Sequence, residues 1–125
     1  MIILKRPKIR MVESGVRLEA EFSINGIKDI LWYEVEEKYS EYLTEERADA
    51  FLVALLFKAI KKGMDLEVLT PVSEKLYYTC NKYLIPLLIE THGYKPIKLI
   101  CNEITSEPIV NKGAVGTGLS CGIDS

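Results

Sequence analysis

The sequence has few of the residues that build metal centres and disulfide frameworks. Its 125 residues include one histidine and three cysteines, and Cys80, Cys101 and Cys121 lie too far apart to form a CxxC pair. A structural zinc site needs closely spaced ligands, and a disulfide framework needs paired cysteines. We therefore expect neither. Unpaired thiols suit the reducing environment of the cytoplasm, where we expect the protein to reside.

Long apolar runs and an excess of basic charge are also missing. The longest apolar stretch, 50–57, is far shorter than the roughly 20 residues that a membrane-spanning helix needs. The apolar run at the N-terminus is too short for a signal peptide, and its positive charges follow it. With 16 basic and 18 acidic residues the net charge is −2. We therefore expect no membrane partner and no binding of a nucleic-acid backbone by this segment.

The charge that is present is unevenly distributed along the chain. Residues 34–49 contain seven acidic side chains against two basic ones. The first 17 residues contain one acidic side chain and five basic ones, namely Lys5, Arg6, Lys8, Arg10 and Arg17. Short runs of like charge are usually solvated faces and loop ends, and we interpret both segments in this way.

A β-hairpin is predicted in the first third of the chain. The composition is globular, with 48% hydrophobic and 27% charged residues. Residues 17–24 alternate between polar and apolar, and residues 27–35 are apolar and rich in β-forming types. Asn25 and Gly26, between these two runs, favour the two positive φ angles of a type I′ turn.

A helix is predicted over residues 45–62. Thr44 is a suitable N-cap, and two lysines followed by Gly63 are typical of a helix C-terminus. Apolar side chains cover so much of this helix that we expect it to pack against more than one neighbour. They are Ala48, Phe51, Leu52, Val53, Leu55, Leu56, Phe57, Ala59 and Ile60.

A second helix is predicted from Thr70 to about Thr91, with Gly93 just beyond its end. Pro86 lies inside it, and we expect a kink there because proline lacks an N–H group and clashes with the preceding turn. His92, close to the helix end, is interpreted as a surface or capping group. The predicted buried stripe consists of Leu76, Cys80, Tyr83, Leu84, Leu87 and Leu88.

Short strands are predicted over residues 65–69, 97–101 and 114–119, with a polar loop over 102–112. The predicted order is therefore hairpin, helix, strand, helix, strand, loop and strand. Alternation of helices and strands indicates an α/β (or α+β) fold.

The glycine-rich segment 113–125 partly matches three motifs with known chemistry. The spacing of a Walker A loop is present, but Leu119 replaces the lysine that contacts the phosphates. A dinucleotide-binding fingerprint would require a third glycine or alanine where Cys121 stands. Residues 118–122 match the GxSxG elbow, with Ser120 as nucleophile, but no histidine follows the serine as that fold requires.

The last six residues resemble a fourth motif more closely. Ser120-Cys121-Gly122-Ile123-Asp124-Ser125 resembles the SGGxDS pyrophosphate-binding loop of the PP-loop ATP pyrophosphatase superfamily, the N-type group that includes GMP synthetase and NAD synthetase. Five of the six positions follow the pattern, with Ile123 at the free position and Cys121 in place of a glycine. In that superfamily, as here in residues 114–119, a strand of small and apolar residues precedes the loop.

The resemblance implies ATP and magnesium as ligands. Ser120, Gly122 and Ser125 would hold the β and γ phosphates through N–H and hydroxyl donors, while Asp124 would help to organise the loop and its magnesium. It also implies a reaction. An oxygen of an unidentified small-molecule or macromolecular substrate attacks the α-phosphate, and pyrophosphate leaves. A nitrogen or sulfur nucleophile then displaces AMP from the adenylated intermediate.

On this hypothesis residues 1–110 form an accessory domain, and residues 111–125 form the first strand and phosphate loop of a truncated ATP-pyrophosphatase domain. The chain would then be the N-terminal part of an adenylating ligase or synthase, and it would be inactive alone. Two alternatives stay open: a noncatalytic interaction domain with an incidental glycine-rich tail, and a truncated GxSxG serine hydrolase. The sequence also leaves open whether the protein forms a homodimer.

Overall fold

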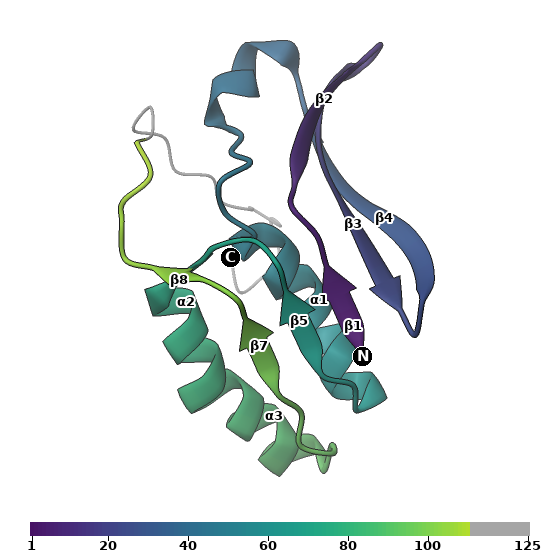
Figure 1. Cartoon of the computed structure of the whole chain (residues 1–125), viewed down its shortest axis with the longest axis vertical. Coiled ribbons are helices and arrows are strands. Elements are labelled where there is room, and N and C mark those ends of the chain that lie inside the picture. Colours follow the sequence, from purple (N-terminus) through teal and green to yellow (C-terminus); the bar gives the residue numbers. More distant parts are fainter. Residues whose placement is uncertain (111–125) are drawn as a thin grey trace, which may run out of the picture.

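A mixed β-sheet with helices against one face organises residues 1–110, the part of the chain that this computed structural model describes (Figure 1). The N-terminal half contributes β1 (Ile2–Leu4), β2 (Lys8–Val12), β3 (Gly15–Ile24), β4 (Ile27–Val35) and a 3-10 helix, η1 (Glu37–Tyr42). The remainder contributes α1 (Asp49–Lys62), β5 (Leu66–Val68), β6 (Val72–Ser73), α2 (Glu74–Thr79), a π-helix, η2 (Cys80–Leu84), α3 (Ile85–His92), β7 (Leu99–Cys101) and β8 (Ile104–Thr105).

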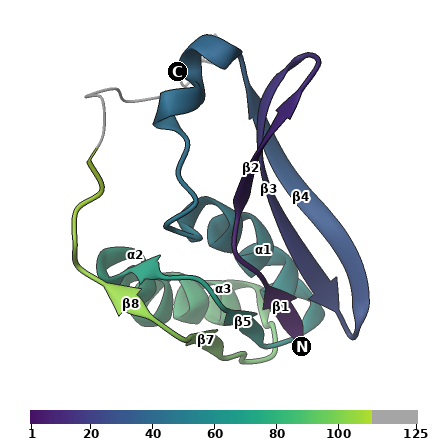
Figure 2. The same ribbon diagram turned by 45° about the horizontal axis from the view of Figure 1, so that its top comes forward.

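Strand β1 lies at the centre of the main sheet. It pairs antiparallel with β3 on one side and parallel with β5 on the other, and β5 pairs parallel with β7. Strand β4 pairs with the far edge of β3, while β6 and β8 form a small sheet of their own. The turned view shows the helices on one side of β1, β5 and β7, and the long β3–β4 hairpin extending beyond them (Figure 2). The predicted α/β class is confirmed.

Strands β1 and β2 follow one another along the same edge of β3, with a bulge between them. Leu4 lies opposite Phe22, and Lys8 lies opposite Glu19. The chain therefore advances four residues from β1 to β2 while β3 advances three. One extra residue is therefore accommodated between β1 and β2. Pro7 lies in this interval and has no N–H to contribute to the ladder, which suits a bulge.

The predicted hairpin is confirmed. Strands β3 and β4 are joined by Asn25 and Gly26, whose φ angles are 51° and 84°, as a type I′ turn requires. Strand β3 buries alternate side chains against the helices, namely Val16, Leu18, Ala20 and Phe22. Its intervening residues therefore lie on the face of the sheet that no described helix covers.

Helix α1 begins four residues later than predicted. Thr44 accepts a hydrogen bond from the Glu46 N–H at 3.1 Å, but this closes a local turn and not the helix. The residues that follow are held by distant partners: the Glu45 carboxylate accepts from the Ile9 N–H at 2.9 Å, and the Ala48 N–H donates to Pro71 at 3.0 Å. These tertiary contacts outweigh the local helix signal. The C-terminus is as predicted, with Gly63 left-handed at φ 65°.

One side of α1 supplies the centre of the core. It packs against β1, β5 and α3, as expected of a helix with several neighbours. Two of the apolar residues predicted to extend its buried surface, Val53 and Phe57, are 56% and 51% exposed, so that part of the prediction is wrong. The buried residues of α1 are Phe51, Leu52, Leu55, Leu56, Ala59 and Ile60.

The second predicted helix contains a π-helical turn before Pro86. The Ile85 N–H donates to the Cys80 carbonyl, five residues back, and α3 then begins with proline in its first turn. A wider turn removes the need for the i−4 hydrogen bond that Pro86 cannot make. The helix ends as predicted, with Gly93 left-handed at φ 67°.

The start and the buried stripe of this second helix differ from the prediction. Residues 72–73 form β6, and Ser73 caps the helix by accepting from the Leu76 N–H at 3.4 Å. Cys80 is buried as predicted, and Leu76 and Leu88 pack half-buried against the core. The extra residue of the π turn rotates the rest of the apolar stripe, so that Ile85 is buried. Three residues of the predicted stripe are exposed instead: Tyr83, Leu84 and Leu87.

The strands predicted over 65–69 and 97–101 are confirmed as β5 and β7, each shortened to three residues. Within the predicted loop 102–112 the structure contains the two-residue strand β8. Strands β1 and β2 were not predicted, because each is short and acquires its partners from later in the chain. The strand predicted over 114–119 lies outside the described residues.

Replacing Gly15 with alanine is expected to lower the free energy of unfolding by about 1–3 kcal/mol. A Cβ at Gly15 would overlap the backbone carbonyl oxygen of Val35 across the β3–β4 ladder, so the strands would have to separate locally. Gly26→Ala is the matched control, because a Cβ there meets no atom within 4 Å and only the positive φ is strained. Urea unfolding of both variants checks this, and an equal or larger loss for Gly26→Ala would contradict it.

Candidate functional site

The residues predicted to bind ATP lie outside the described part of the chain. This holds for the whole loop from Ser120 to Ser125, and so for Asp124 as a magnesium ligand and for the Walker A and GxSxG alternatives. The structure therefore leaves these predictions as they stand. Within the described residues, the groups that could bind a ligand or react are His92, two thiols and the charged side chains of the β-sheet.

His92 is a surface residue, as predicted. It is the last residue of α3, and its ring stacks on Tyr94 with the centroids 5.4 Å apart. Its Nδ1 lies 2.8 Å from the Thr91 hydroxyl oxygen. No acidic residue is recorded in contact with the ring, so within the described residues His92 has no partner of the kind that a catalytic triad uses.

The two described cysteines are free thiols that resist ionisation. Cys80 is buried in the π turn, and Cys101 is half-buried at the end of β7. Burial raises the pKa of both thiols, that of Cys101 to about 11, and the carboxylate of Asp49 raises both further. A thiol that stays protonated at neutral pH is a poor nucleophile. Cys121 lies outside the described residues.

Alkylation is expected to be much slower at Cys80 and Cys101 in the folded protein than in the unfolded chain. In a Cys121→Ser background, mass spectrometry after iodoacetamide treatment at roughly pH 8 should show little modification without denaturant and full modification in urea. The unfolded thiol of Cys101 loses its proton first as the pH rises. The free energy of unfolding should therefore fall between the ordinary pKa of 9.0 and about 11. Equal alkylation rates with and without urea would contradict this.

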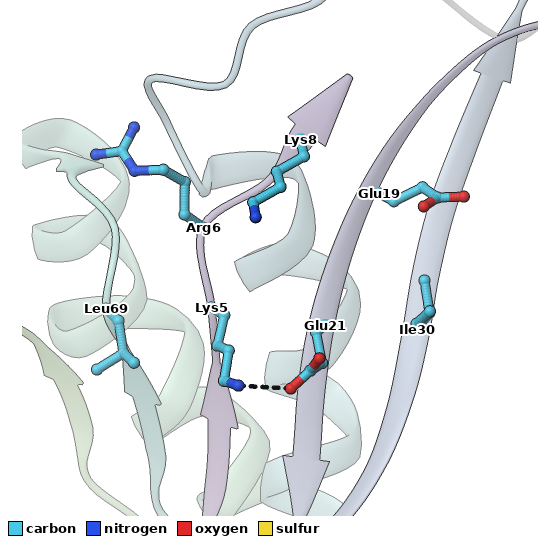
Figure 3. A pocket seen from close by; sticks show the side chains of 7 residues that line it. All are labelled: Lys5, Arg6, Lys8, Glu19, Glu21, Ile30 and Leu69. Carbon is cyan, nitrogen blue, oxygen red and sulfur yellow. Dashed lines mark hydrogen bonds and ion pairs between the residues drawn. The ribbon is translucent and has the colours of Figure 1, made fainter. Parts of the chain in front are cut away.

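A hollow of about 520 Å³ lies where β1 and β5 end (Figure 3). Lys5 and Arg6 follow β1, and Leu69 follows β5. Because these strands are parallel, their carboxyl ends meet at the same edge of the sheet, and β1 is also the strand at which pairing changes from parallel to antiparallel. Ligands of open α/β sheets bind outside the carboxyl ends of the parallel strands. Lys8, Glu19, Glu21 and Ile30 complete the lining.

The charges that line the hollow are partly compensated. The Lys5 ammonium donates to the Glu21 carboxylate at 2.6 Å, and Lys28 lies 3.8 Å from the same oxygen. The hydrogen bond from Lys5 holds the pKa of Glu21 below its ordinary value, with help from the charges of Lys28 and Lys8. The Arg6 guanidinium donates to the neutral backbone carbonyl of Glu45 at 3.1 Å and so keeps its charge available.

This arrangement is suited to binding an anion. Arg6 and Lys8 add positive charge beyond the Lys5–Glu21 pair, and carboxylates and phosphates are the groups that such cations prefer. The lining contains no histidine or thiol. From the sequence alone, the basic residues of the first 17 positions are predicted to form a solvated face. Their acidic partners on β3, Glu19 and Glu21, are identified only once the pairing of the strands is known.

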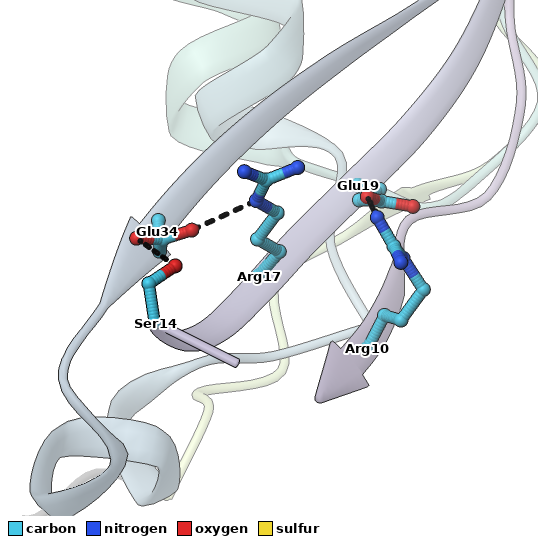
Figure 4. Close-up of polar contacts among 5 residues, drawn as sticks. All are labelled: Arg10, Ser14, Arg17, Glu19 and Glu34. Atoms are coloured by element: carbon cyan, nitrogen blue, oxygen red, sulfur yellow. Dashed lines mark hydrogen bonds and ion pairs between the residues drawn. The ribbon is translucent and has the colours of Figure 1, made fainter. Parts of the chain in front are cut away.

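A second set of ion pairs lies farther along the same sheet face (Figure 4). Arg10 donates to the Glu19 carboxylate at 2.6 Å, and Arg17 donates to the Glu34 carboxylate at 2.8 Å. Ser14 also donates to Glu34, at 3.1 Å. The hydrogen bond from Arg10 lowers the pKa of Glu19, and that from Arg17 lowers the pKa of Glu34. Both carboxyl groups are therefore ionised at neutral pH.

Neither a metal-binding cluster nor a membrane helix is found in residues 1–110. No three histidine, cysteine or acidic side chains of this region are grouped as metal ligands require. None of its helices is both long and apolar enough to span a bilayer. Comparison with known proteins adds no relative: no protein-family model matches the sequence, and no curated protein or solved structure matches it significantly.

Proposed function

We propose that the chain is the N-terminal part of a cytoplasmic ATP pyrophosphatase that adenylates a substrate. The single observation that supports this is the run Ser120-Cys-Gly-Ile-Asp-Ser125, which keeps five of the six positions of the SGGxDS loop. In the proposed reaction a substrate oxygen attacks the α-phosphate of ATP and pyrophosphate leaves. A nitrogen or sulfur nucleophile then displaces AMP.

The donor set of this loop suits its proposed ligands. Ser120 and Ser125 supply hydroxyl and N–H donors for phosphate oxygens, and Gly122 allows the backbone to approach them closely. Asp124 supplies the carboxylate that Mg²⁺ commonly takes from a protein when phosphates provide its other ligands. Bound magnesium would neutralise negative charge on the departing pyrophosphate.

We assign residues 1–110 the role of an accessory domain. Within them the two thiols resist ionisation, and His92 has no acidic partner. The hollow at the carboxyl ends of β1 and β5 is lined by three cations and two carboxylates, an excess of positive charge. Such a hollow is suited to binding an anionic group. We therefore assign the adenylation reaction to the loop that begins at Ser120.

A noncatalytic interaction domain is the second candidate, and one observation favours it. Strand β4 pairs only with β3 among the described strands, and several of its large apolar side chains are exposed. An exposed edge strand of this kind is suited to pairing with another chain. This feature is compatible with either function.

The coding sequence beyond Ser125 distinguishes the ATP pyrophosphatase from the serine hydrolase and from the interaction domain. The ATP pyrophosphatase predicts that an amphipathic helix follows directly, and that further alternating strands and helices follow it. A serine hydrolase would instead show an acidic residue and then a histidine in that order. A stop codon directly after Ser125 would contradict both catalytic functions and leave the interaction domain.

A further inference from the structure

The outer edge of β4 is a long, apolar strand edge. No described element pairs with it, and both ribbon views show β4 as the outermost strand on that side (Figures 1 and 2). Four of its side chains are large, apolar and exposed: Ile27 by 75%, Ile30 by 54%, Trp32 by 46% and Tyr33 by 39%. Folded proteins usually cover or blunt such an edge, because it is a template for strand addition.

The turn geometry fixes which backbone groups point outward. Ile24 and Ile27 close the two-residue turn, so the Ile27 N–H faces β3, and so do those of every second residue after it. Lys28, Ile30, Trp32 and Glu34 therefore direct their N–H and C=O groups away from β3. The Ile30 N–H confirms this direction, because it donates to the Asp29 side chain at 2.8 Å and not to β3.

We propose that β4 pairs antiparallel with β4 of a second copy of this chain, with Leu31 opposite Leu31 on the two-fold axis. Outward-pointing residues must lie opposite one another in such a ladder. This register meets that condition, because it places Ile30 opposite Trp32 and Lys28 opposite Glu34. The two sheets then join into one continuous sheet. The proposal does not depend on the ATP chemistry.

The sequence of β4 is complementary to itself in this register. Lys28 lies opposite Glu34 at both ends of the ladder, which pairs opposite charges. The apolar residues lie opposite one another: Ile30 with Trp32, Ile27 with Val35, and Leu31 with itself. Asp29 with Tyr33 is the one pair that matches neither charge nor hydrophobicity. A shift of two residues in one direction places Lys28 opposite Trp32 and Asp29 opposite Leu31. A shift in the other direction places Glu34 opposite Ile30 and Asp29 opposite Val35.

Of the residues that would form the charge pairs, Lys28 is well exposed, and Glu34 is ionised with its side chain 26% exposed. The Lys28 side chain is 70% exposed and makes only a long contact, 3.8 Å, with Glu21. Glu34 is held ionised by Arg17, and its two carboxylate oxygens can accept more bonds than the two that Arg17 and Ser14 donate (Figure 4). Lys28 of the second copy would supply a further donor.

Contacts on the faces of β4 hold the strand in place for pairing. The Arg17 guanidinium lies 3.9 Å from the centroid of the Trp32 ring on the open face. On the helix face, the Tyr33 hydroxyl donates to the Ala50 carbonyl at 2.9 Å, and its ring packs edge-on against Phe51. A strand fixed on both faces loses little conformational freedom when it binds a partner.

Sedimentation of the 125-residue chain, with two charge-reversal variants, tests the proposal. The wild type should sediment at twice the mass of one chain at concentrations on the order of 100 μM. Lys28→Glu and Glu34→Lys should each raise the dissociation constant by about tenfold, because like charges then face each other at both ends of the ladder. An equimolar mixture of the two variants should form a heterodimer with wild-type affinity, because opposite charges again face each other at both ends of the ladder. Lys61→Glu, at an exposed position near the end of α1, makes the same charge change as Lys28→Glu away from β4 and should leave the dimer intact.

Hydrogen exchange of the wild type provides a measurement that does not depend on whether the variants fold. The amides of Trp32 and Glu34 should be protected at dimer-forming concentrations and should exchange rapidly on dilution. A wild-type chain that sediments as a monomer at the highest concentration would overturn the proposal. So would unprotected Trp32 and Glu34 amides, or folded variants whose mixture forms no heterodimer.

Discussion

Replacing Phe51 with alanine is expected to lower the free energy of unfolding by about 3–5 kcal/mol. The Phe51 side chain is fully buried in α1, and its ring contacts Tyr33 edge-on at a centroid distance of 5.2 Å. The substitution leaves a cavity between the helix and the β3–β4 hairpin, and it removes an aromatic pair. Because small domains are stable by only about 5–15 kcal/mol, much of the native stability should be lost.

Phe57→Ala is the matched control, because it makes the same chemical change on the same helix. Phe57 is 51% exposed, so its loss leaves little or no cavity. We expect its effect to be smaller than that of Phe51→Ala by about 2 kcal/mol or more. Urea unfolding followed by circular dichroism measures both. Equal losses for the two variants would show that α1 does not bury the face that the structure assigns to it.

Replacing Asp124 with alanine is expected to lower pyrophosphate release from ATP by about a hundredfold or more in the protein that the complete gene encodes. In the proposed function Asp124 is the carboxylate that organises the loop and its magnesium. Its removal would leave negative charge on the departing pyrophosphate less well neutralised. A coupled assay for pyrophosphate, with and without magnesium, measures the effect.

Glu13→Ala is the control for this substitution. Glu13 is an exposed carboxylate in the turn between β2 and β3, and its loss should leave pyrophosphate release unchanged. Unchanged turnover in Asp124→Ala, with the fold intact by circular dichroism, would remove Asp124 from the mechanism.

Local signals in the sequence predicted those parts of the fold that depend on local geometry. Asn25 and Gly26 adopt the positive φ angles that their residue types favour, and Gly63 and Gly93 end their helices in the left-handed conformation. Each of these positions is decided by backbone sterics within a few residues. The type I′ turn in turn fixed the register of the hairpin, since a two-residue loop leaves little choice of partners.

Distant contacts decided the parts that the sequence did not predict. Strand β1 is three residues long and is stabilised by β3 and β5, which lie some 20 and 60 residues away along the chain. Helix α1 begins late because Glu45 and Ala48 hydrogen-bond to other elements. The helix propensities of the residues around Thr44 do not reveal these distant hydrogen-bond partners.

The predicted buried stripe of the second helix is wrong at Tyr83, Leu84 and Leu87 for a geometric reason. The prediction applied 3.6 residues per turn from Leu76 to Leu88, whereas the π turn before Pro86 accommodates one residue more. Beyond that turn Ile85 faces the core and Leu87 faces solvent, while Tyr83, within the turn, is also exposed. Pro86 was the signal for this change, because the π turn directly before it removes the need for the i−4 hydrogen bond that proline cannot make.

The hollow at the ends of β1 and β5 shows why a binding site is harder to predict than a turn. Lys5 and Glu21 are 16 residues apart and meet only because β1 pairs with β3. Conversely, the proposed phosphate-binding motif can be identified without tertiary structure, because the residues that resemble it are consecutive, from Ser120 to Ser125.

The products that the complete protein forms from ATP labelled at the α-phosphate test the central proposal most directly. A cytoplasmic extract of small molecules, with magnesium, serves as the source of substrate. An adenylating ATP pyrophosphatase predicts labelled AMP and pyrophosphate in equal amounts, with no accumulation of ADP. Formation of ADP and inorganic phosphate instead would contradict the assignment of Ser120-Cys-Gly-Ile-Asp-Ser125 as a pyrophosphate-binding loop.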